Sequence, residues 1–224
     1  MKLNQFLAMA AATALWSATA WAQSETNFTF AVNQTVPDNN VIGLTLSTNL
    51  TVLGGSIGTV TVTLDLSGGF NGDLYAYLAG PGGQLSVLLN RVGVSNTASQ
   101  FGYSDGGMNV TFSDAGANNI HYYQTVPGYS LNGTTWQPDG RNLDPQSNPN
   151  LIGAASPSTP LSLFTGTNPN GTWTLFLSDV SAGAQSTLLS WDLDITTVPE
   201  PSTLALMAAG LGGVLLLFCR RGTR

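Results

Sequence analysis

The stretch that decides the fold is Thr59-Val60-Thr61-Val62-Thr63-Leu64-Asp65-Leu66, in which polar and apolar side chains alternate without interruption. Successive side chains of a β-strand point to opposite faces, so strict alternation predicts a strand with one buried and one solvent-facing side. The buried side would carry four apolar residues, which are Val60, Val62, Leu64 and Leu66.

The same two-residue period recurs on both sides of this stretch, and Gly, Pro and Asn separate the segments with turn-forming chemistry. Further strands are expected at residues 28–32, 41–46, 73–78, 84–90, 109–112, 172–177 and 189–195. No window between residues 23 and 197 keeps the spacing of an amphipathic helix. About eight strands without helices predict an all-β fold, most simply an antiparallel jelly-roll β-sandwich. Trp173 and Trp191 fall on the inward register and are expected in its core.

The composition fits a folded domain rather than a disordered chain. Hydrophobic residues make up 42% of the sequence and charged residues only 8%. Residues 23–198 hold eleven acidic residues against two arginines and no lysine, for a net charge of −9. Such a surface repels phosphate backbones, so nucleic-acid binding is excluded. The one cysteine, Cys219, lies in the C-terminal apolar tail, so the domain is expected to fold without a disulfide.

The N-terminal residues read as an export signal. Lys2 supplies a short positive region, residues 6–16 are apolar, and Ala20 and Ala22 satisfy the small-residue cleavage rule. Residues 1–22 are therefore expected to be a signal peptide, which the Sec signal peptidase removes before Gln23. The apolar run is too short to cross a membrane as a permanent anchor.

The C-terminal residues 198–224 combine Pro199-Glu200-Pro201, an apolar stretch at residues 204–219 and a basic end that includes Arg220 and Arg221. Together these features resemble a PEP-CTERM sorting signal, with 204–219 as a single hydrophobic transmembrane helix. The resemblance implies a Gram-negative bacterium, transient anchoring in the inner membrane, and recognition by an exosortase. It also implies removal of the tail and delivery to the cell surface or extracellular matrix. A plain C-terminal membrane anchor is the alternative.

A second resemblance covers residues 40–196. It rests on Gly72-Asp73-Leu74, Gly80-Pro81-Gly82-Gly83, Leu88-Leu89-Asn90-Arg91, Asn168-Pro169-Asn170-Gly171-Thr172-Trp173-Thr174-Leu175, Asp179 and Leu189-Ser190-Trp191-Asp192-Leu193. This succession resembles the P domain, also called P/Homo B, of proprotein convertases and bacterial proteases, and it implies a jelly-roll β-sandwich. Members of that family usually follow a subtilisin-like or metalloprotease catalytic domain, which they stabilise. Here the signal peptide leads almost directly into the sandwich, so no catalytic domain is expected.

Residues 115–160 interrupt the strand pattern with a loop-rich insertion that contains many Asn, Pro and Gly residues. Long ordered loops on a β-scaffold often carry binding sites. The aromatic residues of the insertion could stack on sugar rings, or they could form a small core of the insertion itself. These residues are Tyr122, Tyr123, Tyr129 and Trp136, and the best placed for stacking are Tyr122, Tyr123 and Trp136.

No convincing catalytic constellation emerges. Ser104 sits in a Gly-x-Ser-x-Gly pattern and could be ordered with Asp114 and His121 as a hydrolase triad. A nucleophile elbow requires a helix after the serine, however, and more glycine and then a strand are expected there. His121 is expected to be a loop residue that hydrogen-bonds locally. One histidine and no cysteine in the domain cannot fill a zinc site. We therefore expect no enzymatic activity.

Calcium is the one cofactor that the sequence favours, because it binds the carboxylate, amide and carbonyl oxygens that Asp- and Asn-rich turns supply. The candidate ligands lie at expected strand ends or turns and are Asp73, Asp105, Asn109, Asp114 and Asp179. No EF-hand spacing is present, and capping of turns by the same side chains is the alternative.

These observations predict an exported, non-catalytic β-sandwich of the bacterial envelope or extracellular matrix, with a structural or adhesive role. Exopolysaccharide or other surface proteins are the expected partners. Two alternatives stay open, namely a carbohydrate-binding module that uses the loop aromatics and a P domain that assists a serine endopeptidase.

Overall fold

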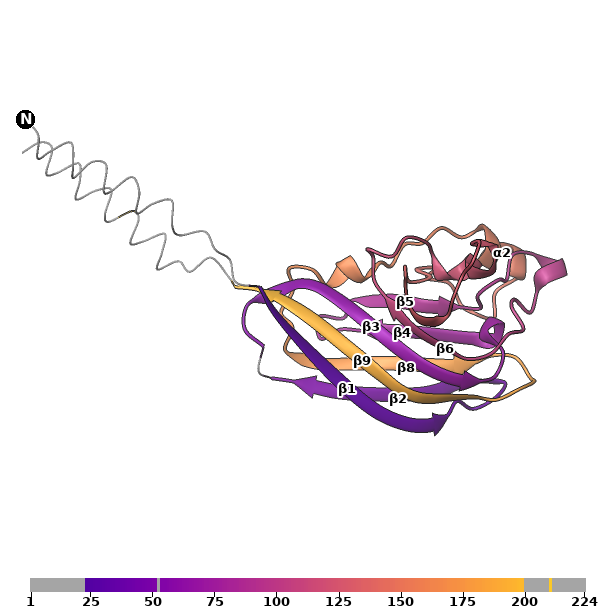
Figure 1. The fold of residues 1–224 in the computed structure, drawn as a ribbon, viewed down its shortest axis with the longest axis horizontal. Coiled ribbons are helices and arrows are strands. Elements are labelled where there is room, and N and C mark those ends of the chain that lie inside the picture. The colour runs from indigo at the N-terminus through magenta and orange to yellow at the C-terminus, as the bar shows by residue number, and fades with distance from the viewer. Residues whose placement is uncertain (1–22, 52, 200–209, 211–224) are drawn as a thin grey trace, which may run out of the picture. The chain divides into compact units, whose positions relative to one another are not determined.

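The computed structural model describes residues 23–51 and 53–199 together with Gly210. Ser24–Thr197 form one compact unit built from two β-sheets that enclose an apolar core (Figure 1). Within the described residues the chain forms nine strands, one six-residue α-helix and four short 3₁₀ helices. The predicted all-β class is therefore confirmed.

The first sheet has five strands in the spatial order β1-β9-β3-β6-β7. Their bounds are β1 Ser24–Thr35, β3 Ser56–Gly68, β6 Met108–Phe112, β7 Asn132–Trp136 and β9 Ser186–Val198. β3 contains the alternating stretch from which the fold was inferred, and the four apolar residues of its inward face are all buried. Alternation identified both this strand and the side that faces the core.

The second sheet has four strands in the order β2-β8-β4-β5, and all its ladders are antiparallel. Their bounds are β2 Asn40–Leu50, β4 Leu74–Ala79, β5 Leu85–Asn90 and β8 Gly171–Asp179. On β8 the buried residues Trp173, Leu175 and Leu177 occupy every second position, as predicted. Asp179 occupies the next position of that same buried row and ends the strand. A carboxylate therefore continues a line of apolar core residues.

Aromatic rings fill much of the space between the sheets. Trp191 is stacked on Phe30 with 4.5 Å between ring centroids, and Trp173 packs against Phe164 at 5.0 Å. The indole N–H of Trp173 donates to the carbonyl oxygen of Pro169, so its one polar group is satisfied. Both tryptophans lie in the core as expected.

The expectation of a purely antiparallel sandwich is wrong at one edge. β7 pairs in parallel with β6, and the sequence pattern did not predict β7 at all. The strand reads Asn132-Gly133-Thr134-Thr135-Trp136, so it has a single large apolar side chain and no alternation to detect. The finer jelly-roll connectivity stays a prediction.

The insertion at residues 115–160 packs against the second sheet. The main-chain N–H of Asp139 donates to Leu88 O at 3.0 Å, and that of Gly140 donates to Val87 O at 2.9 Å. These bonds occupy the free edge of β5, which would otherwise be open to another chain.

The helical segments are η1 Asn71–Asp73, η2 Thr97–Ser99, η3 Ile120–Thr125, α2 Pro149–Ala154 and η4 Leu161–Phe164.

Several predictions concern residues outside the described part of the chain. The signal peptide at residues 1–22, with Ala20 and Ala22, lies there, and so do Glu200, Pro201, Arg220 and Arg221. The expected transmembrane helix at 204–219 is also outside it, apart from Gly210. Among the residues that are described, no helix has the length and apolar character needed to span a bilayer. Gln23 and Pro199, which flank the domain, are exposed.

Candidate ligand-binding sites

Two pockets share the loop at residues 101–107, which leads from the turn after η2 into β6. Residues 105–107 line the larger pocket, and residues 101–104 line the smaller one. The larger pocket is called the tyrosine pocket below, and the smaller one the phenylalanine cleft.

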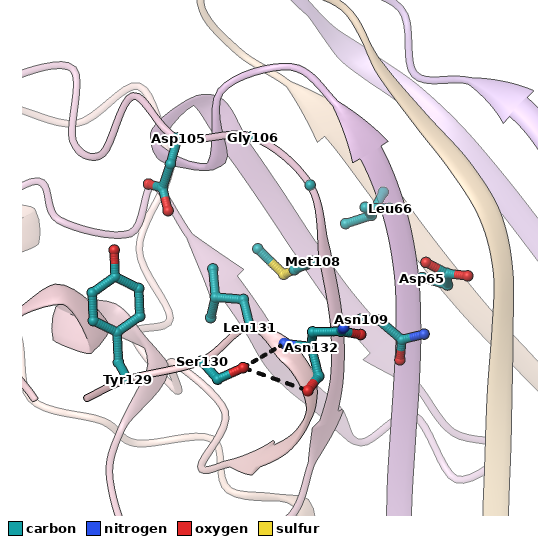
Figure 2. Close-up of a pocket in the computed structure, with 11 residues that line it drawn as sticks. Asp65, Leu66, Asp105, Gly106, Met108, Asn109, Tyr129, Ser130, Leu131 and Asn132 are labelled. Atoms are coloured by element: carbon teal, nitrogen blue, oxygen red, sulfur yellow. Dashed lines mark hydrogen bonds between the residues drawn. The ribbon is translucent and has the colours of Figure 1, made fainter.

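The tyrosine pocket has a volume of about 550 Å³ and is bounded mainly by polar groups (Figure 2). Its side chains include Asp65, Asp105, Asn109, Tyr129 and Asn132. Asp65 and Asn109 are cross-strand neighbours on β3 and β6. Tyr129 is 40% exposed, and its ring packs against that of Tyr123 with 5.2 Å between centroids. The pocket thus combines an accessible aromatic face with carboxylate and amide groups.

Asp105 is held in place by two donors. The Tyr123 hydroxyl donates to Asp105 Oδ1 at 2.5 Å, and the side-chain amide of Gln124 donates to the same oxygen at 2.8 Å. Burial raises the pKa of Tyr123, and the hydrogen bond to Asp105 raises it further, so the phenol keeps its proton. The arrangement offers fixed acceptors and amide donors of the kind that bind hydroxyl groups.

The phenylalanine cleft has a volume of about 300 Å³. Phe70 and Phe101 line it and are unusually exposed for phenylalanine, at 36% and 62%. The buried residue Asp73 also lines it, as do Tyr103, Ser104 and Ser181. The cleft therefore has an acidic group among its inner residues and two exposed aromatic rings.

A second buried carboxylate adjoins Asp73. Val180 N–H donates to Asp73 O at 2.9 Å, and Leu74 is the register partner of Asp179, so η1 and the end of β8 lie side by side. Asp179 is fully buried. Its Oδ1 accepts a long 3.4 Å hydrogen bond from Ser181 N–H, whereas its Oδ2 has no hydrogen-bond partner.

Burial sets the protonation of this pair. It raises the pKa of Asp179 to about 6, against the Ser181 N–H bond, and the charges of Asp73 and Asp38 add to the rise. The pKa of Asp73 is also raised by burial, an effect that Arg91 and the Ser181 side chain oppose. Two desolvated carboxylates side by side are typical of sites that bind a proton or another cation.

Arg91 is the nearest basic residue, but it is held by carbonyl oxygens rather than by the acids. Its Nη2 donates to Gln100 O at 2.9 Å and its Nε to Gly72 O at 3.4 Å. Burial lowers the pKa of Arg91, and the charges of Asp73 and Asp179 partly restore it. Across the described residues, the ion pairs within 4.0 Å all involve Asp139, so neither Asp73 nor Asp179 has a direct counter-ion there.

His121 belongs to a separate buried network. Its Nδ1 lies 2.6 Å from Asp139 Oδ2 and its Nε2 lies 2.8 Å from Val94 O. Both ring nitrogens of His121 therefore face oxygen atoms inside the domain. Arg141 Nη1 donates to Asp139 Oδ1 at 3.2 Å, so His121 and Arg141 contact different oxygens of the same carboxylate. The network ties η3 to the end of β5, because Asn90 N–H also donates to Asp139.

The hypothetical triad of Ser104, Asp114 and His121 is not assembled. Both ring nitrogens of His121 are engaged elsewhere, and Asp114 accepts hydrogen bonds from Leu161 N–H and Ser162 N–H at the start of η4. Ser104 lines the phenylalanine cleft. The expectation of a loop residue with local hydrogen bonds is wrong for the His121 side chain, which is buried in η3 and contacts residues 18 and 27 positions away in the sequence.

The aromatic residues proposed for sugar stacking behave differently from one another. Tyr123 and Trp136 are buried and pack against each other at 6.4 Å, so neither offers a free ring face, and this part of the stacking hypothesis is wrong. They belong to the main core of the sandwich, where Tyr103 packs 4.7 Å from Tyr123, so the alternative of a separate core within the insertion is also wrong. Tyr122 is half-buried between the His121 ring and the Arg141 guanidinium.

The five candidate calcium ligands do not converge. Asp73 and Asp179 adjoin at one place, Asp105 and Asn109 share the tyrosine pocket, and Asp114 caps η4. In residues 23–51 and 53–199, no three His, Cys, Asp or Glu side chains gather closely enough to hold a metal ion. Calcium binding stays a prediction, and Asp73 with Asp179 is the pair that best supports it.

Sequence reasoning did not single out Phe70, Phe101 or Tyr129 as a set. Phe70 and Phe101 stand among glycines and polar residues, outside any alternating run, and this isolation is a usable signal of exposure. The pairing of Asp139 with His121 and Arg141 had no comparable signal, because it depends on how the insertion folds back.

Comparison with known proteins identifies the C-terminal segment. Residues 197–221 match the family model of the PEP-CTERM protein-sorting motif. The match marks an exported protein with a C-terminal membrane-anchor sorting signal of Gram-negative bacteria, which an exosortase processes.

Among curated proteins, none matches the sequence. The domain is similar to two solved structures of a serine protease from Aeromonas sobria, one of which also contains its chaperone. The complex aligns with a TM-score of 0.44 at 15% identity over 84% of this chain and 29% of that chain. The protease alone aligns with a TM-score of 0.42 at 15% identity over 79% of this chain and 27% of that chain. This chain thus spans less than a third of the length of either.

Proposed function

We propose that this exported protein acts as a non-catalytic β-sandwich in the envelope or extracellular matrix, where it has a structural or adhesive role. The observation that carries the proposal is the sorting motif at residues 197–221. Such a signal directs a protein out of the cytoplasm, so the domain meets surface polymers and other exported proteins rather than metabolites.

The environment of the single histidine supports a non-catalytic role. His121 is fully buried, and both its ring nitrogens are hydrogen-bonded inside the domain. A histidine that serves as general base needs one nitrogen within reach of a substrate or nucleophile. The network of His121, Asp139 and Arg141 instead stabilises the insertion over β5.

The sorting step is tested by cell fractionation together with the intact mass of the mature protein. We expect the unaltered chain to lose both the segment before Gln23 and the segment with residues 204–219, and to be found outside the inner membrane. The Glu200→Gln variant and the double variant Arg220→Gln, Arg221→Gln should stay in the membrane fraction with the tail attached. Thr223→Ala, in the same tail, is the matched control and should be processed normally. Cytoplasmic full-length protein would contradict the proposal.

A second candidate function is carbohydrate binding, and the tyrosine pocket is the observation that favours it. Tyr129 presents an exposed ring beside Asp65, Asp105, Asn109 and Asn132, the mixture of groups that binds sugars. Retention on exopolysaccharide should fall in Tyr129→Ala and in Asn109→Ala. Leu163→Ala removes an exposed apolar side chain elsewhere and should leave retention unchanged. Equal retention of all three variants would show that the tyrosine pocket does not bind the polysaccharide.

The resemblance at residues 40–196 supports the finer proposal that the sandwich is a P-domain-like jelly roll. A role beside a serine endopeptidase would follow from that resemblance alone, and no feature of the two pockets favours it.

A further inference from the structure

The phenylalanine cleft is a preformed site, because main-chain hydrogen bonds fix its wall. Gly72 N–H donates to Tyr103 O at 2.8 Å, and Tyr103 N–H donates to Val92 O at 3.0 Å. Gly72 approaches this wall so closely that a Cβ atom there would lie 2.3 Å from Phe101 O. The segment that carries Phe101 is thus anchored to η1, the element that carries Asp73, without any help from a ligand.

The charges behind the cleft are unbalanced. Asp73 and Asp179 are buried side by side, and Asp38 lies close enough for its charge to act on Asp179. Against these three carboxylates stands Arg91, whose hydrogen bonds go to carbonyl oxygens. One oxygen of the fully buried Asp179 has no partner. Buried carboxylates are usually paired or coordinated, and Asp73 is the one of the two that lines the cleft, where a cation could reach it.

The lining of the cleft indicates which kind of cation fits. Phe70 and Phe101 are exposed and line the cleft, and aromatic rings attract an ammonium group and pack against the carbon atoms next to it. A calcium ion would make no use of the rings, and it would lack a third acid ligand in the described residues. The volume of about 300 Å³ also exceeds what a bare ion fills.

We propose that the phenylalanine cleft binds a protonated primary amine of an amino-sugar polysaccharide, with Asp73 as counter-ion and Phe70 and Phe101 against the sugar carbons. This inference rests on the proposed function in the envelope or matrix. The domain itself has no lysine between residues 23 and 198, so this part of a second copy could not supply the side-chain amine. Its net charge of −9 attracts a polycation.

A polymer suits the site better than a single amine does. The loop at residues 101–107 lines both the cleft and the tyrosine pocket, so under this proposal one polymer would contact both. The cleft would select the charged unit, and the tyrosine pocket would accept the hydroxyl groups of a neighbouring unit. Such a divided site gains avidity from linked contacts.

The test compares two hexasaccharides by calorimetry with the mature protein at near-neutral pH and low salt, namely a glucosamine hexamer and its fully N-acetylated counterpart. We expect the glucosamine hexamer to bind and the neutral one to bind at least about tenfold more weakly. Asp73→Asn and Phe101→Ala should each weaken glucosamine binding about tenfold. Asp144→Asn makes the same change in net charge on an exposed carboxylate, and Leu151→Ala removes an exposed apolar side chain, so both should bind normally.

Every other outcome would overturn the proposal. Equal weakening by Asp73→Asn and Asp144→Asn would show attraction by bulk charge only. Binding of a lysine hexapeptide with the same variant dependence, without glucosamine binding, would assign the cleft to a protein partner. Calcium binding that Asp73→Asn abolishes, again without glucosamine binding, would make it a metal site. Phe101→Ala changes an exposed ring and should stay folded. If Asp73→Asn does not fold, normal glucosamine binding by Phe101→Ala would still overturn the proposal. Loss of glucosamine binding with normal sorting would reject this inference while the proposed function stands.

Discussion

Replacing Asp179 with asparagine should stabilise the protein above neutral pH, in contrast to most substitutions of a fully buried residue. Asp179 ends the inward row of β8, and its Oδ2 has no hydrogen-bond partner. Ionising it therefore places a charge where neither water nor a donor compensates it. Asparagine has nearly the same shape, keeps an oxygen for Ser181 N–H and carries no charge.

The expected change in the free energy of unfolding follows from the pKa of Asp179. Burial, with the charges of Asp73 and Asp38, raises the pKa of Asp179 from 3.8 to about 6. Each tenfold change in proton affinity is worth about 1.4 kcal/mol, so this rise amounts to about 3 kcal/mol. The folded-state pKa is the higher one, so the folded protein binds the Asp179 proton more tightly than the unfolded chain does. The stability that this protonated form contributes is complete below about pH 4 and is lost as the pH rises through about 6. An unpartnered amide N–H costs about 1–3 kcal/mol, which leaves a net gain of up to about 2 kcal/mol for the variant at about pH 8.

Urea unfolding of the purified protein and of Asp179→Asn, at about pH 4.5 and about pH 8, measures this difference. EDTA should be present, because a bound cation would favour the ionised carboxylate and mask the effect. The comparison between variant and parent removes the contribution of all other acids. We expect the variant to gain free energy of unfolding relative to its parent as the pH rises. A variant that loses stability equally at both pH values would show that the Asp179 charge is already compensated and would refute the reasoning.

Three further outcomes test other parts of the structure. Trp136→Ala should lower the free energy of unfolding by about 3–5 kcal/mol, because the ring is buried and its indole N–H donates to Ser130 O at 3.1 Å; an unchanged urea midpoint would place the ring at the surface after all. Asp139→Ala should lower the free energy of unfolding by about 3–5 kcal/mol, since it leaves the buried Arg141 without its anion and His121 Nδ1 without its partner; a loss below about 1 kcal/mol in the same titration would contradict the network. Calcium should raise the melting temperature and EDTA lower it if Asp73 and Asp179 hold the ion, and calorimetry that shows no response to either would end the calcium prediction.

The strands could be predicted because each depends on a pattern within a few residues. Alternation in residues 59–66 identified β3 and its buried side, and the same rule located every other strand of both sheets except β7. β7 has no alternation of its own and exists because the edge of β6 offers free hydrogen-bonding groups. Its parallel pairing depends on the path of the chain between β6 and β7, and no local sequence pattern encodes that path.

The site residues were harder to predict, because burial of an aromatic ring depends on distant segments. Tyr123 and Trp136 lie among polar residues that favour a surface loop, yet contacts with Tyr103 and with each other place them in the main core. Tyr129, a few residues away, has 40% of its surface exposed. The three residues are all aromatic and lie in the same polar stretch, and their exposure depends on the pairing of β7 with β6 and on the contact between Tyr103 and Tyr123.

The burial of Asp179 could have been predicted from the sequence pattern of β8. Trp173, Leu175 and Leu177 predict an inward side chain two residues further on, and the residue found there is an acid. A polar residue on a core register is a conflict between local pattern and side-chain chemistry, and such conflicts concentrate at functional sites. Here the conflict adjoins Asp73 and the phenylalanine cleft, with no counter-ion in the described residues within 4.0 Å. A cation bound beside Asp73 in the cleft would offset the Asp73 charge, which is one of the causes that raise the pKa of Asp179, and would thereby lower the cost of ionising Asp179.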